Sequence, residues 1–371
     1  MHKKYILEKI NKTLGVRLGA GLDWKLNFAV LFLVAIGLIS LFGARIDLFW
    51  KQLMWLGFGL ILIFLIVKFD WRSFINHKWA IFGIYWLSVF LLILTLILAP
   101  KIRGTRAWIP IGPFQFQTSV FAALALIIIL ANFFKKEHKS IARISKILKS
   151  FVYFAIPSGL VALQPDFGSV LLLFFIWFGF ILVSGIPWRH LLVAVLIFAV
   201  LGVAMWQVVL KEYQKDRILG LFFPNRDVLG INYNVVQSKI AIGSAGFFGK
   251  GFKQGTQVQL GFLPEAQTDF IFAAVIEEWG LFSGFLMIIA FITIILRIVF
   301  IGLDEKNNFN RFICLGTAIY FCANFIFNTG SNIGLLPVIG VPFPFLSYGG
   351  SHIMAEFVLI GIVQSIKIRK I

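Results

Sequence analysis

Long apolar stretches alternate with short polar or basic stretches along almost the whole chain. Ten apolar segments each have room for a membrane-spanning helix of about 20 residues, tilted or slightly short in places. Their approximate limits are 26–44, 50–67, 79–99, 118–134, 150–165, 168–186, 190–209, 269–297, 311–330 and 350–366. The pattern predicts an all-α polytopic membrane protein with ten transmembrane helices and one large loop, residues 211–268, between the seventh and eighth helices.

The composition agrees with this pattern. Of 371 residues, 60% are hydrophobic, and a soluble domain of this size could not bury so much apolar surface. The net charge of +18 is expected from loops that face anionic lipid, and it does not indicate nucleic-acid binding. Cys314 and Cys322 fall within one apolar segment, so we interpret them as packing residues.

The distribution of Lys and Arg predicts the orientation. Segments on the side of the two termini hold 22 of the 34 basic residues, and seven of the remaining twelve lie in the long loop, which the positive-inside rule discounts. Both termini are therefore expected in the cytoplasm and loop 211–268 outside. Residues 1–25 are expected to form a cytoplasmic juxtamembrane segment, as an interfacial helix or a polar tail, before one membrane domain over 26–371.

The long loop ends in LPEAQTDF, residues 263–270, immediately before an apolar segment. Asp269 stands there where water meets the bilayer, and a partly desolvated carboxylate in that position is a candidate functional residue. The alternative is a helix cap, in which Thr268 and Asp269 close the first helical turn. The loop has 58 residues, and a connection of that length favours a functional role.

Basic residues elsewhere on the predicted outer side are candidates for phosphate recognition. Arg103 and Arg106 lie beside Trp108, although an interfacial anchor explains the same composition. The glycines around Lys250 suggest a nucleotide loop, but no strand precedes them and no Ser or Thr follows the lysine. An ATPase is therefore excluded.

Residues 332–351 contain three prolines and the pair Gly349-Gly350, so they cannot form an uninterrupted helix. Non-helical backbone at membrane depth is tolerated where it is buried in protein or lines a cavity, and this segment is predicted to wall a cavity open to the outside. Asp166, in QPDFGS at the outer junction of two spans, can face the same cavity.

Three glutamates lie inside predicted spans. Ionisable groups at such positions are functional candidates, and a neutral, hydrogen-bonded glutamate between helices is the alternative. They are Glu277, Glu278 and Glu356.

Five motifs together resemble the SEDS family of membrane-embedded cell-wall polymerases, and its RodA branch more than its FtsW branch. They are RGTRAWIPIGPFQFQ (103–117), QPDFGS (164–169), YNVVQSKIAIGSAGFFGKGF (233–252), GTQVQLGFLPEAQTDFIFA (255–273) and GLLPVIGVPFPFLSYGGS (334–351). The motifs occur in order across nearly the whole chain, with ten spans.

The resemblance implies a peptidoglycan polymerase that uses lipid II at the outer face of the plasma membrane, with inversion, in cell elongation and shape maintenance. Asp269 is implied to be the general base toward the acceptor hydroxyl. Substrate-binding roles are implied for Arg103, Arg106, Lys239, Lys250, Glu265, Thr268 and Ser347, and a divalent cation, Mg²⁺ or Mn²⁺, is implied near Asp166. Implied partners are lipid II, the nascent glycan, membrane lipids and a class B penicillin-binding protein, without nucleic acid.

The sequence departs from the family pattern at several positions. The family usually has a Glu/Lys pair shortly after Phe116-Gln117, the end of the first motif, and here apolar Val120 and Ala123 stand at those positions. Gln267 stands where His is usual, and Ala245 where Gly is usual. These departures keep two alternatives open: a flippase or other transporter of a lipid-linked precursor, and a weakly active scaffold of the elongation machinery.

Overall fold

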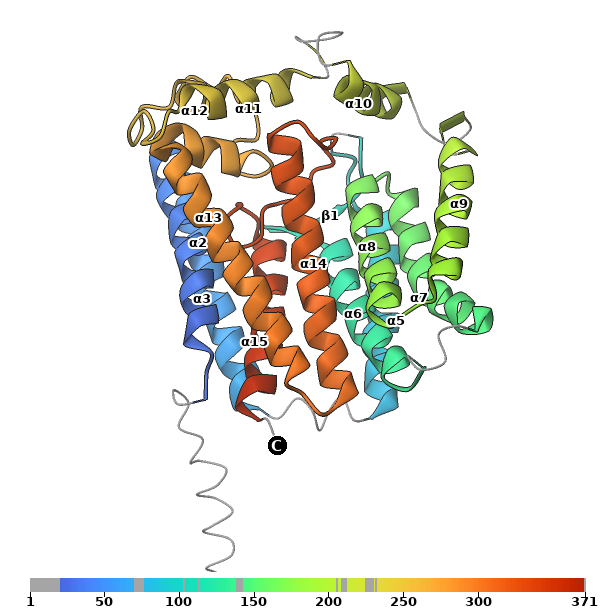
Figure 1. Ribbon diagram of the computed structural model, residues 1–371. Coiled ribbons are helices and arrows are strands. Elements are labelled where there is room, and N and C mark those ends of the chain that lie inside the picture. Colours follow the sequence, from blue (N-terminus) through green and yellow to red (C-terminus); the bar gives the residue numbers. More distant parts are fainter. Residues whose placement is uncertain are drawn as a thin grey trace, which may run out of the picture.

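A computed structural model, shown in Figure 1, describes residues 21–69, 77–102, 104–112, 114–137, 143–204, 206–207, 212–223, 230 and 232–369. The predicted interfacial helix near the N-terminus and Arg103 lie outside the described residues. Each of the ten predicted apolar segments coincides with a helix. These helices are α2 (Trp24–Ala44), α3 (Ile46–Lys68), α5 (Lys78–Leu98), α6 (Thr118–Glu137), α7 (Ile144–Leu163), α8 (Phe167–Val183), α9 (Trp188–Ala204), α13 (Ile271–Leu303), α14 (Asn308–Asn332) and α15 (Gly350–Ile368).

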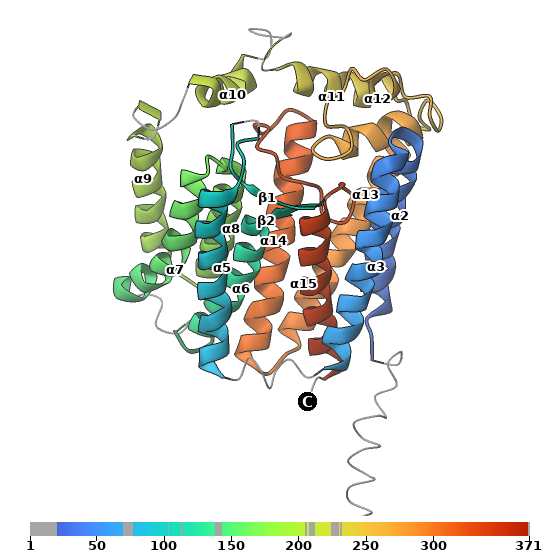
Figure 2. The ribbon, with the colours of Figure 1, turned by 180° about the vertical axis from the view of Figure 1, so that it is seen from behind.

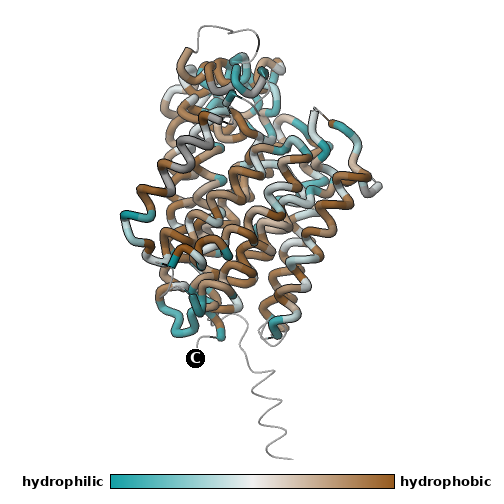
Figure 3. Tube along the Cα trace, turned by 90° about the vertical axis from the view of Figure 1, so that its right-hand side faces the viewer, coloured by the Kyte–Doolittle hydropathy of each residue, from teal (hydrophilic) through white to brown (hydrophobic). Residues whose placement is uncertain are grey.

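Eight of these helices are long and apolar enough to cross a membrane, which makes the chain a multi-pass membrane protein. The other two, α8 and α9, have 17 residues each, and the count of ten spans stays a prediction. Apolar residues cover the middle of the bundle, and hydrophilic residues gather toward its two ends (Figure 3).

The bundle is organised around α6, which is the most deeply buried of the long apolar helices. It packs against α5, α7, α8 and α14, while α15 packs on α3 and α13 packs on both α2 and α14. The described ends of the chain lie together, because the Asp23 amide donates to Gln364 Oε1 at 2.9 Å and Arg297 forms an ion pair with Asp23. Both views place α10–α12 at the opposite end of the bundle (Figures 1 and 2).

The long loop carries three helices that the apolar pattern does not predict. They are α10 (Glu212–Phe222), α11 (Tyr233–Ser244) and α12 (Thr256–Gln259). A β-hairpin is likewise unpredicted: β1 (Trp108–Ile111) pairs antiparallel with β2 (Phe114–Gln117). Segment 333–349 is non-helical, as its prolines require, and this prediction is confirmed.

The eighth predicted segment differs most from expectation. A single helix was predicted over 269–297, but α13 begins at Ile271 and its backbone leaves the helical conformation at Gly280, with φ 79° and ψ 175°. A Cβ at Gly280 would lie 2.1 Å from the Phe247 carbonyl oxygen, so only glycine fits both this conformation and this contact. The break divides α13 into a short part before Gly280, beside the long loop, and a long part after it.

Candidate active site

Asp269 lies in a turn, residues 264–270, that precedes α13. The Glu265 carbonyl accepts from the amides of Thr268 and Phe270, each at 3.1 Å. The Thr268 hydroxyl donates to Glu265 Oε2 at 3.0 Å, which braces the turn from its side-chain face. The N-cap of α13 is Phe270, and the Thr268 hydroxyl bonds to Glu265 within the turn, so Thr268 does not cap the helix.

Two asparagines of α14 hold the main chain of Asp269. Asn328 Nδ2 and Asn332 Nδ2 donate to the Asp269 carbonyl at 2.9 and 2.8 Å. Asn332 Oδ1 also accepts from the Ala273 amide at 3.1 Å, so it fixes the start of α13 as well. The Asp269 side chain is half-buried. Sequence reasoning missed both asparagines, although their four-residue spacing with Asn324 on an apolar helix is a usable signal.

The non-helical segment 333–349 completes this side of the site. The Ser347 hydroxyl donates to the Thr268 carbonyl at 2.6 Å and accepts from the Phe343 amide at 2.9 Å. Phe345, within the same turn, has φ 64°, and its amide donates to Glu356 Oε2 at 2.8 Å. The structure therefore brings Glu265, Thr268 and Ser347 into one network with Asp269.

Asp166 lies beside the same segment. A Cβ on Gly340 would stand 3.9 Å from Asp269 Oδ2, and one on Gly168 would stand 2.1 Å from the Ile339 carbonyl oxygen. Ile339 and Gly340 thus contact the turn that carries Asp166 and the turn that carries Asp269. The two turns that carry these carboxylates therefore adjoin one stretch of backbone.

The Asp166 carboxylate is the N-cap of α8 and is half-buried. Ser169 donates to it through both its hydroxyl, at 2.7 Å, and its amide, at 3.2 Å, and Gln117 Nε2 donates at 3.4 Å. Burial raises the pKa of Asp166 above its usual range, and the hydrogen bonds from Ser169 and Gln117 oppose that shift. Gln117 also connects this group to His352 Nε2 at 3.1 Å.

The donor set around Asp166 does not fit a resident metal ion. Mg²⁺ is usually held by one or two carboxylates together with waters and substrate phosphates and not by protein groups alone. Across the described residues, no group of three or more His, Cys, Asp or Glu side chains is placed to hold a metal. Asp166 is surrounded instead by neutral hydrogen-bond donors, so no step of the mechanism is assigned to a cation.

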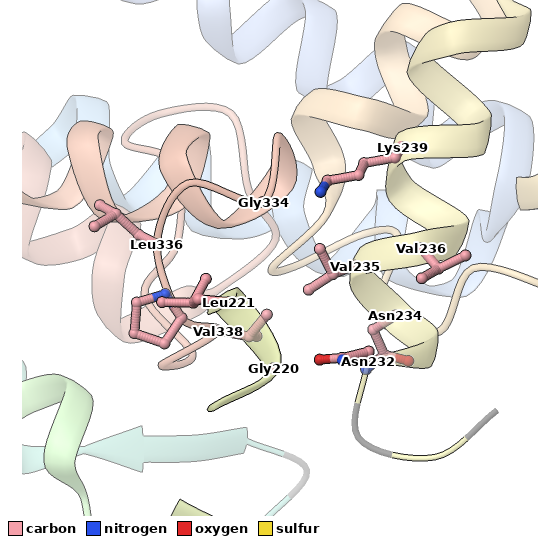
Figure 4. A pocket seen from close by; sticks show the side chains of 11 residues that line it. Gly220, Leu221, Asn232, Asn234, Val235, Val236, Lys239, Gly334, Leu336 and Val338 are labelled. Carbon is pink, nitrogen blue, oxygen red and sulfur yellow. The ribbon is translucent and has the colours of Figure 1, made fainter. Parts of the chain in front are cut away.

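Lys239 of α11 lies against the other end of segment 333–349. Together with Asn232, Gly220, Gly334 and residues 336–338 it lines a cavity of about 70 Å³, which has room for a few water molecules. Figure 4 shows its side chain extending toward Gly334, where a Cβ would meet Nζ at 2.4 Å. The Ser238 hydroxyl donates to the Asn332 carbonyl at 2.8 Å, so α11 and Asp269 are fixed to the same residue.

The remaining predicted cations lie in different surroundings. Arg106 is exposed, and its amide donates to the Gln164 carbonyl at 3.1 Å, close in sequence to Asp166. Lys250 pairs with Glu277 at 2.8 Å. Glu278 accepts a hydrogen bond from Gln259 Nε2 at 3.1 Å. Since Glu277 accepts from Lys250 and Glu356 accepts from the Phe345 amide, each of the three candidate glutamates has a hydrogen-bonded partner.

The fold and this site define a polytopic α-helical membrane protein whose candidate catalytic carboxylate lies where its large loop meets the bundle. The family model of FtsW, RodA and SpoVE, described as cell cycle proteins, matches residues 24–370. The chain belongs to this family.

Curated relatives and solved structures agree. The peptidoglycan glycosyltransferase MrdB of Escherichia coli K12 is 32% identical over 338 residues, with 91% of this chain and 90% of that protein covered. The chain is also similar to Thermus thermophilus RodA, a rod shape determining protein, with a TM-score of 0.69, 27% identity and 95% and 98% coverage. A structure of a peptidoglycan synthase complex contains a chain with a TM-score of 0.80, 32% identity and 93% and 97% coverage.

Proposed function

We propose that this chain is a peptidoglycan glycosyltransferase that polymerises glycan strands from lipid II by an inverting transfer at the outer face of the plasma membrane. The position of Asp269 carries the proposal. Its main chain is fixed by two asparagines, its turn is held by hydrogen bonds to Glu265 and from Ser347, and Asp269 itself is half-buried at the end of the bundle. A carboxylate held in this way can accept the proton of an acceptor sugar hydroxyl.

The leaving group of this reaction is a lipid diphosphate, which requires nearby positive charge. Lys239 suits this role, because its amine lies against the backbone segment whose other part contacts Asp269. Arg106 and Arg103 are the further candidates on the predicted outer side. The cavity beside Lys239 is too small for a disaccharide, so the sugars are expected to lie outside it.

The proposed reaction requires loop 211–268 and Asp269 outside the cell and both termini in the cytoplasm. Both described chain ends lie opposite α10–α12, in support of this orientation. Cysteines introduced at Ser145 and Gln254, both exposed, test it with a membrane-impermeant thiol reagent on intact cells. Labelling is expected at position 254 alone. Labelling at position 145 alone would show that the orientation is the reverse of the proposed one.

A class B penicillin-binding protein is the proposed partner. The similar chain in a peptidoglycan synthase complex supports an assembly of this kind. Loop 211–268 contains no Ser-x-x-Lys motif, so a transpeptidase serine would have to come from another chain. Polymerisation is expected to be faster with the transpeptidase than without it, even when the partner's own serine is replaced.

The test of the function is polymerisation of purified lipid II by the purified chain in detergent, alone and with the transpeptidase. Glycan strands of several disaccharides are expected, and their length and rate can be followed on gels. Transport of lipid II across vesicles without any polymer would favour the flippase alternative. If a thermal melt shows that the chain is folded and neither polymer nor transport is observed, the result would favour the scaffold alternative.

A further inference from the structure

Glu277 occupies an unusual position for a carboxylate, since it lies in an apolar helix and its side chain has no exposed surface. Four donors satisfy it. Oε1 accepts from Lys250 Nζ at 2.8 Å, from the Thr256 hydroxyl at 3.2 Å and from the Gln257 amide at 2.9 Å. Oε2 accepts from the Val258 amide at 3.2 Å. A buried charge with this many donors is paired and fully hydrogen-bonded.

The donors all come from one part of the loop, residues 250–258. Lys250 contributes its amine, and α12 contributes the amides and the hydroxyl at its start. Lys250 also donates to the Thr256 hydroxyl at 2.9 Å, so two of the three partners of Oε1 are bonded to each other as well. The carboxylate therefore gathers a lysine and a helix start that would otherwise be connected only through a glycine-rich stretch.

The backbone of the loop enters the break in α13 at the same place. The amides of Lys250 and Gly251 donate to the carbonyls of Glu277 and Glu278 at 3.0 Å each. On the other side of Gly280, the amides of Leu281 and Phe282 donate to the carbonyls of Gly246 and Phe247 at 3.0 and 3.1 Å. Residues 246–251 thus replace the helical hydrogen bonds that the break removes.

This attachment continues to the catalytic turn. The Leu263 amide donates to the Gln257 carbonyl at 2.9 Å, which fixes the approach of the chain to residues 264–270. Leu263, Ala266 and Phe270 pack in one buried cluster with Ala273 and Ala274 of α13. Glu277 is therefore connected to Asp269 from two directions, along α13 and through α12.

We propose that Glu277 and Lys250 form an ion-pair latch that holds residues 246–263 on α13 and positions Asp269. Lys250 then has a positioning role and does not bind the donor diphosphate. The proposal rests on the proposed function of Asp269 as the general base. Glu277 is a positioning residue, because the groups it touches belong to the protein.

Four variants test the latch in the lipid II assay: Lys250→Met, Glu277→Gln, the double variant and Lys253→Met. The last is a matched control, since Lys253 is a loop lysine that lies over the rings of Phe42 and Phe252. Lys250→Met leaves a buried carboxylate without its cation, and a misplacement of about 1 Å can lower kcat by about 10²-fold. We expect that loss with KM for lipid II within about twofold, and near-normal kinetics for the control.

The double variant decides between the two roles of Lys250. If the pair is a latch, adding Glu277→Gln to Lys250→Met removes the unpaired charge and recovers part of kcat, a non-additive result. If Lys250 binds the diphosphate, Lys250→Met raises KM and the effects of the two substitutions multiply. That second result would overturn the proposal.

Hydrogen exchange gives a readout that needs no activity. Glu277→Gln is expected to increase exchange at the amides of Gln257 and Val258, and then at those of Thr268 and Phe270. Unchanged protection at all four amides would overturn the latch, even if the variant were inactive. If the wild-type chain polymerises nothing, the proposed function fails, while this exchange experiment still shows whether the latch holds the turn.

Discussion

Asp269 and Glu277 stand eight residues apart, yet the structure holds them in opposite ways. Asp269 is held through its main-chain carbonyl, which accepts two asparagine amides, and its carboxylate is half-buried. Glu277 is held through its carboxylate, which is fully buried and accepts from four donors. The backbone contacts of Asp269 fix its place at a half-buried position, whereas the contacts of Glu277 engage both of its side-chain oxygens with protein donors, so Glu277 serves the structure.

The comparison shows why an acidic residue in an apolar span is weak evidence of catalysis. The sequence alone makes both residues candidate functional residues for the same reason, because each is a carboxylate at or within a membrane segment. The partners separate them: amides and an ammonium group around Glu277 remove its need for water. The comparison can therefore be tested by removing hydrogen-bond partners or by adding a carboxylate that has no partner.

The largest effect on stability is expected from a carboxylate placed without partners. Val120 and Ala123 of α6 are 3% and 1% exposed, at the positions where the family pattern has a Glu/Lys pair. Val120→Glu is expected to destabilise the protein by about 3 kcal/mol, because a charge inside an apolar helix is costly. A thermal melt in detergent measures the loss.

Adding Ala123→Lys sharpens that test. The two new charges would lie one helical turn apart and are expected to recover part of the melting temperature. Val120→Gln serves as the uncharged control. A double variant that melts no higher than Val120→Glu would mean that partners at this spacing do not rescue a buried carboxylate here.

A smaller effect is expected from Asn332→Ala, which removes the group that holds Asp269 and Ala273. The buried polar atoms left behind should cost about 1–3 kcal/mol of stability, and turnover should fall in addition. Asn324→Ala is a matched control on the same helix, since Asn324 is equally buried and donates to the Tyr320 carbonyl. Equal turnover in the two variants would remove the positioning role of Asn332.

The smallest effect is expected from Ser347→Ala, which loses the hydrogen bond to the Thr268 carbonyl and the one from the Phe343 amide. A loss of about 1 kcal/mol corresponds to a fall of about fivefold in turnover if the turn shifts only in the active state. Ser351→Ala removes a comparable hydroxyl that donates to the Gln115 carbonyl, and it should leave turnover unchanged. A larger loss of turnover in Ser351→Ala than in Ser347→Ala would mean that the contact with the hairpin matters more for turnover than the contact with the Asp269 turn.

The helices of the bundle could be predicted from the sequence because length and hydropathy decide them in lipid. The break in α13 could not, since an isolated glycine in an apolar run is compatible with a continuous helix. Its cause is a backbone segment about 30 residues earlier, Gly246–Gly251, and such distant hydrogen bonds leave no periodic signal. The hairpin at 108–117 could not be predicted either, because two four-residue strands are too short to produce a clear alternation of apolar and polar residues.

The candidate site was predictable in part. Asp269 and Ser347 could be named from motifs, and the structure places them in one network. The contrast between Lys239 and Lys250 could not be predicted, because both are lysines in one polar loop. Only the fold shows that Lys250 meets the buried Glu277, while Lys239 lies against Gly334. A long-range ion pair depends on tertiary packing, which one sequence does not encode in any local spacing.

The central claim is that the Asp269 carboxylate acts as the base while its backbone sets its place. The most direct test is the rate of lipid II polymerisation by Asp269→Asn, which keeps the size of the side chain and the main-chain carbonyl that accepts from Asn328 and Asn332. Turnover is expected to fall by about 10²–10⁴-fold with an unchanged thermal melt. Turnover within about twofold of the wild type would contradict the account and leave Asp269 a structural residue like Glu277.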